Sequence, residues 1–213
     1  MLTGERMELF HITNIRNLES IFNCGKILSK NKVDSLNQEY LSIAYEKLQN
    51  RRSLKRVPYS PYAVLHDYVP FYFAPRSPML CAIHHGRVRG YRGGQDEIIH
   101  LVTELPRILE NRLKFVYTDG HPIMAITNFY NETERINNVI DWEVMNARYW
   151  SDTQDDPDRE RRRQAEFLVY EDFPVSLLTK IAVISDRILN RVNQVIGRFN
   201  FEIDYLIERE WYY

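Results

Sequence analysis

Four short segments rich in β-branched and aromatic residues divide the second half of the chain, and such segments favour strands. They are, in chain order, Glu97–Val102, Phe115–Thr118, Phe167–Tyr170 and Lys180–Ser185. Helical periodicities lie between them without regular alternation, and no glycine-rich strand–turn–helix fingerprint or P-loop is present. We therefore predict an α+β fold of about six or seven strands, mostly antiparallel and split or curled around a cleft.

The first half of the chain begins with a short strand over Leu9–Thr13, which leads directly into a helix over Ile15–Cys24. Gly25 follows, and glycine suits the left-handed residue that ends a helix. Apolar residues four apart predict a second helix over Ser35–Arg52. The aromatic segment Tyr68–Ala74 is a further strand.

Pro70 lies inside that aromatic strand, and its missing amide predicts an edge strand or a bulge. Helices are expected over Ser77–His85 and Ile188–Phe199, and alternating apolar residues from Phe201 onward predict a terminal strand. The sequence shows neither an internal repeat nor a linker. We expect one domain spanning residues 1–213.

Composition excludes several classes of protein. Aromatic residues make up 13% of the 213 residues and the net charge is −1, which argues against disorder and against bulk binding of polyanions. A local basic stripe stays compatible with that charge. No apolar run is long enough for a membrane span, no secretion signal is recognisable, and two isolated cysteines fit a reducing compartment. The sequence therefore predicts a cytoplasmic protein.

Metal and thiol chemistry find little support in the sequence. The histidines lack ligand spacing, and we interpret the acidic cluster Asp155, Asp156 and Asp158 as a solvated loop, so we expect no metal. Cys81 lies on the apolar side of a predicted helix without a catalytic signature. It is interpreted as a structural thiol.

Three segments combine polar groups with strand ends. His11 and Thr13 project from one strand face; alternatively, Thr13 is a helix N-cap beside a half-buried histidine. The block His66–Met79 predicts an aromatic wall for a planar ligand, or an edge strand against the core. Glu166 begins a strand at a sheet rim, where partial desolvation suits acid–base or electrostatic chemistry. Its alternative is a salt bridge with the run Arg159–Arg163.

In this order, these segments resemble the ADP-ribosyltransferases, and more specifically the DarT-type bacterial toxins that modify a base in single-stranded DNA. The blocks that carry the resemblance are HIT at 11–13, LHDYVPFYFAPRSPM at 65–79, YTDGH at 117–121, DDPDRERRRQAEFLV at 155–169 and the WYY end. The resemblance implies a split, mostly antiparallel sheet around an NAD cleft with peripheral helices. It also implies NAD as co-substrate and no metal.

The same resemblance implies roles for single residues. Glu166 matches the catalytic glutamate, and Arg52, with Arg51 as the neighbouring register, matches the arginine that supports catalysis and contacts NAD. His11 and Thr13 match the element that holds the nicotinamide end. The segment 35–52 resembles the loop and helix that close over NAD.

Residues on the DNA side follow from the same blocks. His121 matches a histidine near the DNA base, where either it or Glu166 would take the base proton. Tyr72 and Met79 fall on blocks that line the cleft, Tyr72 on the NAD side. The segment 128–158 resembles the substrate-recognition loop, and its Tyr149 is a stacking candidate. Other DNA-binding candidates are Trp150 and Arg162, with core packing proposed for Trp142, Tyr149 and Trp150 as the alternative and a solvated helix face for Arg162.

The resemblance implies a toxin that ADP-ribosylates a base in single-stranded DNA, with thymine favoured and guanine as the alternative. A macrodomain antitoxin is the implied partner, and we expect a monomer. The chain departs from the family just before residue 65, where it has VPYSPYAV instead of glycines. The alternative functions are an ADP-ribosyltransferase acting on protein or RNA, an NAD glycohydrolase, and a non-catalytic nucleic-acid-binding module.

Overall fold

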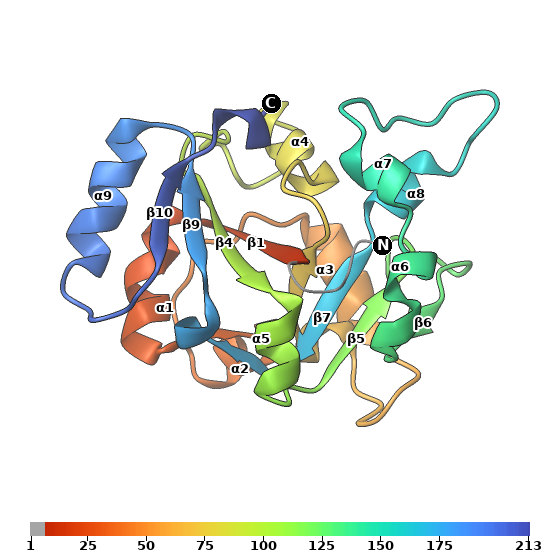
Figure 1. Cartoon of the computed structure of the whole chain (residues 1–213), viewed down its shortest axis with the longest axis horizontal. Coiled ribbons are helices and arrows are strands. Elements are labelled where there is room, and N and C mark those ends of the chain that lie inside the picture. The colour runs from red at the N-terminus through yellow and green to blue at the C-terminus, as the bar shows by residue number, and fades with distance from the viewer. Residues whose placement is uncertain (1–6) are drawn as a thin grey trace.

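The computed structural model describes residues 7–213 and contains a twisted eight-stranded sheet with helices packed around it (Figure 1). In sheet order the strands are β10 (Asp204–Ile207), β9 (Lys180–Val183), β4 (Ile98–Glu104), β1 (Glu8–Asn14), β3 (Tyr68–Tyr72), β7 (Glu166–Tyr170), β5 (Phe115–Thr118) and β6 (Phe129–Tyr130). Only β9 and β10 run parallel. A separate antiparallel pair joins β2 (Lys26–Leu28) to β8 (Asp172–Pro174). The predicted α+β class and antiparallel sheet are confirmed.

The helices are short and peripheral. They are α1 (Leu18–Cys24), α2 (Lys30–Ser35), α3 (Glu46–Leu54), α4 (Pro78–His84), α5 (Leu105–Glu110), α6 (Ile136–Val139), α7 (Trp142–Asn146), α8 (Arg159–Arg163) and α9 (Asp186–Ile196). Helices α1 and α9 pack together beside β10, while α6 to α8 gather at the opposite side (Figure 1). Gly25 ends α1 with φ of 72°, as its position predicts. Between residues 7 and 213, none of the helices has the length and apolarity needed to span a membrane.

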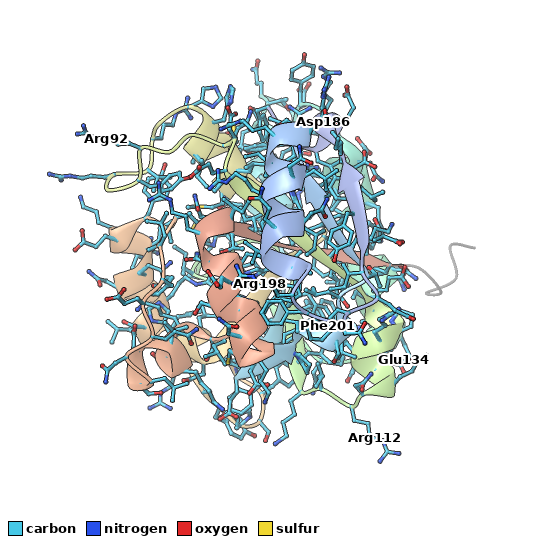
Figure 2. The ribbon with its side chains drawn as sticks, turned by 90° about the vertical axis from the view of Figure 1, so that its left-hand side faces the viewer. Arg92, Arg112, Glu134, Asp186, Arg198 and Phe201 are labelled. Carbon is cyan, nitrogen blue, oxygen red and sulfur yellow. The ribbon has the colours of Figure 1, made fainter. Side chains whose placement is uncertain are left out.

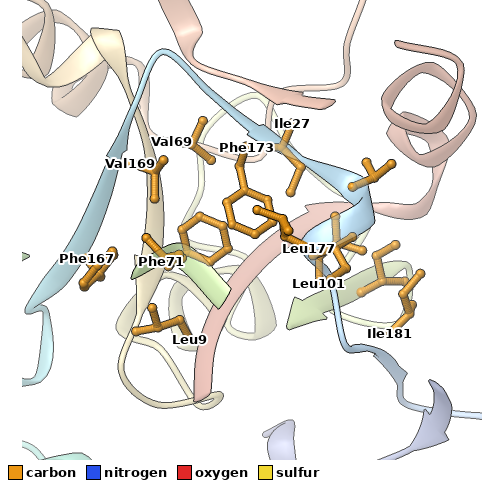
Figure 3. Packing of buried hydrophobic residues seen from close by; sticks show 14 of the residues in the cluster. Leu9, Ile27, Val69, Phe71, Leu101, Phe167, Val169, Phe173, Leu177 and Ile181 are labelled. Carbon is orange, nitrogen blue, oxygen red and sulfur yellow. The ribbon is translucent and has the colours of Figure 1, made fainter. Parts of the chain in front are cut away.

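The main core lies against the centre of the sheet. Phe71 packs edge-to-face on Phe173 there, and Phe167 packs edge-to-face on Phe73 in the same cluster; Phe71, Phe167 and Phe173 are fully buried (Figure 3). Burying a phenylalanine contributes about 1.5–3 kcal/mol. Leu168, on the other face of β7, packs in a second cluster with Val116, so β7 is buried on both sides. That burial fixes the register of its first residue, Glu166.

The sheet is split between β1 and β3. All seven residues of β1 pair with β4, but only Phe10 pairs with β3, opposite Tyr72. Pro70 is therefore on an interior strand, and the predicted edge strand or bulge is wrong. The side of Pro70 that lacks an amide faces this seam, where the carbonyl of Pro70 accepts a hydrogen bond from Nδ1 of His11 (2.8 Å).

The predicted helix over Ser35–Arg52 is wrong in its first part, because the chain between α2 and α3 forms a turn and irregular structure instead of a helix. The cause is Asn17. Its amide nitrogen donates to the carbonyl of Leu41 (3.0 Å), and its amide oxygen accepts from the amide of Leu41 (2.7 Å). Both backbone groups are thereby taken from helical pairing. Leu41, Ile43 and Tyr45 then pack on a small hydrophobic cluster beside α4.

Candidate functional site

A cavity of about 300 Å³ lies at the seam, enclosed by strands β1, β3 and β7 and by the segment 38–52. Seven of the residues predicted from sequence line it: His11, Thr13, Arg52, Tyr72, Met79, His121 and Glu166. These residues come from six separate parts of the chain. The fold thus brings together the HIT strand, the aromatic strand and the strand that begins at Glu166.

At the base of the cavity, Arg52 from α3 forms a two-pronged ion pair with Glu166, the first residue of β7. Nη1 and Nη2 of Arg52 donate to the two carboxylate oxygens over 2.8 and 2.9 Å. Only 8% of Arg52 and 4% of Glu166 are exposed. Burial by itself would lower the pKa of Arg52, but the Glu166 carboxylate outweighs it and the pKa is raised. Arg52, not Arg51, is the arginine of the site.

The turn after β5 places His121 beside this pair. The hydroxyl of Thr118 accepts a hydrogen bond from the backbone amide of Glu166 (3.0 Å) and donates one to the carbonyl of Gly120 (2.7 Å). These two bonds connect the turn to β7. Residue 120 must be glycine, because a Cβ there would lie 2.9 Å from the backbone oxygen of Arg161. The pocket therefore receives the imidazole in a defined position.

His121 is electrically neutral at pH 7. Burial lowers its pKa to about 4, although the Glu166 carboxylate acts in the opposite direction. Its Nδ1 is buried and lacks a hydrogen-bond partner among residues 7–213. A neutral imidazole with an uncommitted nitrogen can accept a proton or bind a polar ligand atom.

On the other side of the seam, β1 presents His11 and Thr13. The Pro70 carbonyl fixes the imidazole of His11, and burial lowers the pKa of that ring. Thr13 accepts a hydrogen bond from Asn17 (3.0 Å), which also binds Leu41. Asn17 therefore connects the HIT strand to the segment that covers the cavity.

Tyr72 and Met79 complete the wall. The Cα of Tyr72 lies directly opposite that of Glu166 on the neighbouring strand. Burial raises the pKa of Tyr72, and so does the nearby carboxylate of Glu166. Met79 comes from the first turn of α4, which Ser77 caps by accepting the amide of Leu80 (3.1 Å).

Two predicted DNA-binding residues, Tyr149 and Arg162, lie outside the cavity lining. Tyr149 is 83% exposed, so core packing does not describe it. Arg162 is held by the carboxylates of Asp141, Asp156 and Asp158. Both remain predictions as DNA contacts.

The acidic cluster lies on an exposed loop, as expected from the sequence, and two of its side chains, Asp156 and Asp158, also pair with arginines of α8. Helix α8 is not a solvated face, since Arg163 is only 4% exposed. Trp142 packs on the core edge-to-face with Phe73. Cys81 is partly buried, and burial raises the pKa of its thiol.

Sequence reasoning missed two residues that organise the site, Asn17 and Thr118. Asn17 lies four residues after Thr13, among the apolar residues of a predicted helix, and that polar interruption is the signal that could have found it. Thr118 ends the FVYT strand within the YTDGH block, but its hydrogen bond to Glu166 is visible only in three dimensions. Within the described part of the chain, no group of three or more His, Cys, Asp or Glu side chains is arranged to hold a metal ion.

A buried guanidinium–carboxylate pair at the seam of a split sheet, flanked by two neutral histidines, suits transfer of a sugar whose reaction centre becomes positively charged. The fold and site define an ADP-ribosyltransferase. The chain belongs to the DarT family: the profile described as "ssDNA thymidine ADP-ribosyltransferase, DarT" matches residues 10–213. The predicted family, the enzyme class of NAD-dependent DNA ADP-ribosyltransferase and NAD as co-substrate are thereby confirmed.

The relatives agree over nearly the full length. A DNA ADP-ribosyl transferase of Thermus sp. (strain 2.9) is 41% identical over 211 residues, covering 98% of this chain and 97% of the relative. Its structure in complex with ADP-ribosylated ssDNA has a TM-score of 0.92 at 40% identity, covering 98% and 97% of the two chains. The complex with NAD+ has a TM-score of 0.88 at 38% identity, covering 98% of each chain.

Proposed function

We propose that the protein transfers ADP-ribose from NAD to a thymine in single-stranded DNA and acts as the toxin of a toxin–antitoxin system. The observation that carries the catalytic part is the Arg52–Glu166 pair at the base of a cavity shared with His11, Thr13 and His121. The match to a family profile described as acting on thymidine supports the choice of base, and the 41% identical Thermus relative supports DNA as the substrate.

Glu166 carries the electrostatic part of the reaction. Cleavage of the bond between nicotinamide and ribose passes through a cation-like transition state on the sugar. A carboxylate that hydrogen-bonds a ribose hydroxyl stabilises this charge more than it stabilises the ground state. Arg52 holds both oxygens of Glu166, so the carboxylate stays fixed in direction. The guanidinium, which the resemblance implies contacts NAD, has the buried carboxylate as its two-pronged partner.

The nucleophile is the ring nitrogen of thymine, which must lose its proton as the new bond to the ribose carbon forms. Both oxygens of Glu166 receive hydrogen bonds from Arg52, whereas the neutral imidazole of His121 lines the same cavity. We therefore assign proton removal to His121, a contribution of about 10²–10⁴-fold. A base stacked in a duplex cannot enter the cavity, which accounts for a single-stranded substrate.

On the NAD side, the neutral imidazole of His11 and the hydroxyl of Thr13 are placed to bind the nicotinamide end. Tyr72 provides an aromatic wall next to Glu166. We further propose that residues 1–213 act as a single domain and as a monomer, in the cytoplasm where NAD and DNA occur together. A macrodomain protein that removes the modification is the proposed antitoxin, by analogy with DarT-type systems.

Mass spectrometry of short oligonucleotides after incubation with NAD tests the proposal. Each oligonucleotide of the set contains one candidate base, and RNA and protein acceptors are included. We expect the mass of one ADP-ribose on thymine-containing single strands only. Label on guanine would correct the base, label on RNA or protein would reject the substrate class, and release of free ADP-ribose alone would indicate a glycohydrolase.

A further inference from the structure

Residues 86–94 (GRVRGYRGG) form a loop between α4 and β4 that the proposed chemistry does not use; we call it the arginine loop. Its three arginines, Arg87, Arg89 and Arg92, are exposed. None of them forms an ion pair or hydrogen bond through its side chain with residues 7–213. In a chain with a net charge of −1, the loop is a local concentration of uncompensated positive charge.

The backbone of the arginine loop is anchored. Val88 and Tyr91 alternate with the arginines and are only 3% and 6% exposed. The hydroxyl of Tyr91 accepts a hydrogen bond from Asn14 (2.9 Å) and donates one to the carbonyl of Gly94 (3.1 Å). Because these buried residues hold the loop, its arginines are presented to solvent from a fixed base. Such preorganisation reduces the entropy lost on binding.

The arginine loop is connected to the cavity wall through a shared hydrophobic cluster. Val88 and Tyr91 belong to one hydrophobic cluster with Ile12 of β1, and Leu41 and Met79 from the cavity wall pack against that cluster. In Figure 2, Arg92 projects on the same side of the molecule as helices α2 and α3, whose segment covers the cavity. A strand entering the cavity with one base can therefore continue along this surface.

Neighbouring carboxylates form no ion pair with the arginine loop. Residues 86–94 contain no acidic side chain; of the two that follow, the exposed Asp96 makes no ion pair with the loop, and Glu97 is already bound to Arg191 (2.6 Å) and lies 3.7 Å from Arg16. Guanidinium groups match phosphate geometry closely, and phosphate contacts position a nucleic acid without reading its sequence.

We propose that the arginine loop binds backbone phosphates of the single-stranded DNA outside the cavity, next to the nucleotide being modified. The inference rests on the proposed function and adds a second, sequence-independent subsite to it. Tyr91 is buried and so does not stack on a base, which makes the contact purely one of charge and hydrogen bonding. The subsite would raise affinity for any single strand long enough to reach it.

The test compares two variants with equal loss of charge. One carries Arg87→Gln, Arg89→Gln and Arg92→Gln; the control carries Arg112→Gln, Lys114→Gln and Arg187→Gln, three exposed cations outside the loop. In Figure 2, Arg112 lies at the opposite end of the molecule from Arg92. Circular dichroism and melting temperature establish that both variants fold.

Fluorescence anisotropy with labelled oligonucleotides gives Kd as a function of salt. For a strand of about 12 nucleotides we expect the loop variant to bind about tenfold more weakly, with a salt slope smaller by about 2, corresponding to three lost phosphate contacts. A strand of about five nucleotides should discriminate little between parent and variant, because it does not reach the loop. The control variant should stay within about twofold of the parent.

Two results overturn the inference: an unchanged ratio of affinities for long and short strands in the loop variant, or an equal weakening in the control variant. Failure of the proposed function looks different. A parent protein that binds strands in a loop-dependent way but transfers no ADP-ribose refutes the proposed function and supports the subsite. A parent that modifies DNA while the loop variant keeps its KM and salt slope refutes the subsite alone.

Discussion

Two buried arginines, Arg52 and Arg163, show how differently the same side chain is used in two regions. Arg52 faces a carboxylate in the cavity, and its pKa is raised because Glu166 outweighs burial. Arg163 lies beneath the segment 141–158, where it donates to the carbonyls of Val144, Met145 and Arg76. Burial lowers its pKa to about 10, and none of the carboxylates in the described chain pairs with it.

On the proposed function, the charge of Arg52 serves the chemistry and the charge of Arg163 serves the structure. A guanidinium that donates only to carbonyl oxygens stabilises the backbone, and it does not position a carboxylate that could act on a substrate. A guanidinium paired with a carboxylate at a cavity wall fixes the group that meets a developing cation. Substitutions of Arg52 or Glu166 should therefore change the rate of reaction, and substitutions of Arg163 should change stability.

The largest effect is expected for Glu166→Gln. The amide has nearly the same size but lacks the charge that stabilises the transition state, so kcat should fall by at least about 10²–10³-fold. The measurement is ADP-ribosyl transfer at saturating NAD and oligonucleotide, with circular dichroism to establish folding. Glu171→Gln, just beyond the end of β7, is the control. A rate within tenfold of the parent would show that Glu166 is not catalytic.

Arg163→Met should be the most destabilising of the substitutions compared here. It retains the apolar stem but leaves buried carbonyls without a donor, which lowers the free energy of unfolding by about 2–4 kcal/mol. Urea denaturation measures the loss. Arg162→Met on the same helix is the control and should cost about 1 kcal/mol or less, because its ion pairs are more exposed. Equal losses of unfolding free energy in the two variants would show that Arg163 is no more important for stability than Arg162.

Arg52→Lys tests the two-pronged geometry. Lysine keeps the charge but cannot bind both carboxylate oxygens as a planar fork, so kcat/KM should fall by roughly 10–100-fold. Arg51→Lys is the matched control, since Nη2 of Arg51 makes one long contact of 3.5 Å with the carbonyl of Ile123. Steady-state kinetics with varied NAD measure the difference. Equal losses in the two variants would contradict a special role for the two-pronged pair, and a larger loss in Arg51→Lys would favour the neighbouring register.

The smallest effect concerns acid. Burial lowers the pKa of both His100 and His121 to about 4, against an ordinary value of 6.5. Between pH 6.5 and 4 the unfolded chain binds protons that the folded chain does not, so stability falls as pH decreases through this range. At pH 5 the loss is about 1–2 kcal/mol for each histidine. Urea denaturation at pH 7 and pH 5 measures it; His121→Asn should reduce the dependence, whereas the exposed His84→Asn should not.

Local patterns predicted most of the fold. Strands such as Phe115–Thr118 carry their β preference in every residue, and Gly25 marks the end of α1 because a left-handed backbone is required there. The helix over Ser35–Arg52 failed because Asn17, far along the chain, binds the backbone of Leu41. Pairing between distant residues overrides a local apolar period.

The candidate site shows the same limit. The blocks around His11, Glu166 and His121 could be assigned to one cavity because a family resemblance supplied their assembly. The partner of Arg52 could not be assigned, because phosphate groups and carboxylates both suit a guanidinium. Only the folded chain brings Nη1 of Arg52 within 2.8 Å of the Glu166 carboxylate. The arginines of α8 likewise meet their aspartates through folding of the segment 141–158.

The proline inside β3 bears on how nucleotides enter. Pro70 has no amide hydrogen, and its carbonyl accepts a hydrogen bond from His11. Strands β1 and β3 therefore do not pair beyond Phe10 and Tyr72. The opening between the two halves of the sheet is therefore set by the proline itself. A dinucleotide that binds there does not have to break hydrogen bonds between strands. Binding energy from the adenosine half of NAD is then not used to separate strands, and it can distort the ribose toward its reactive conformation.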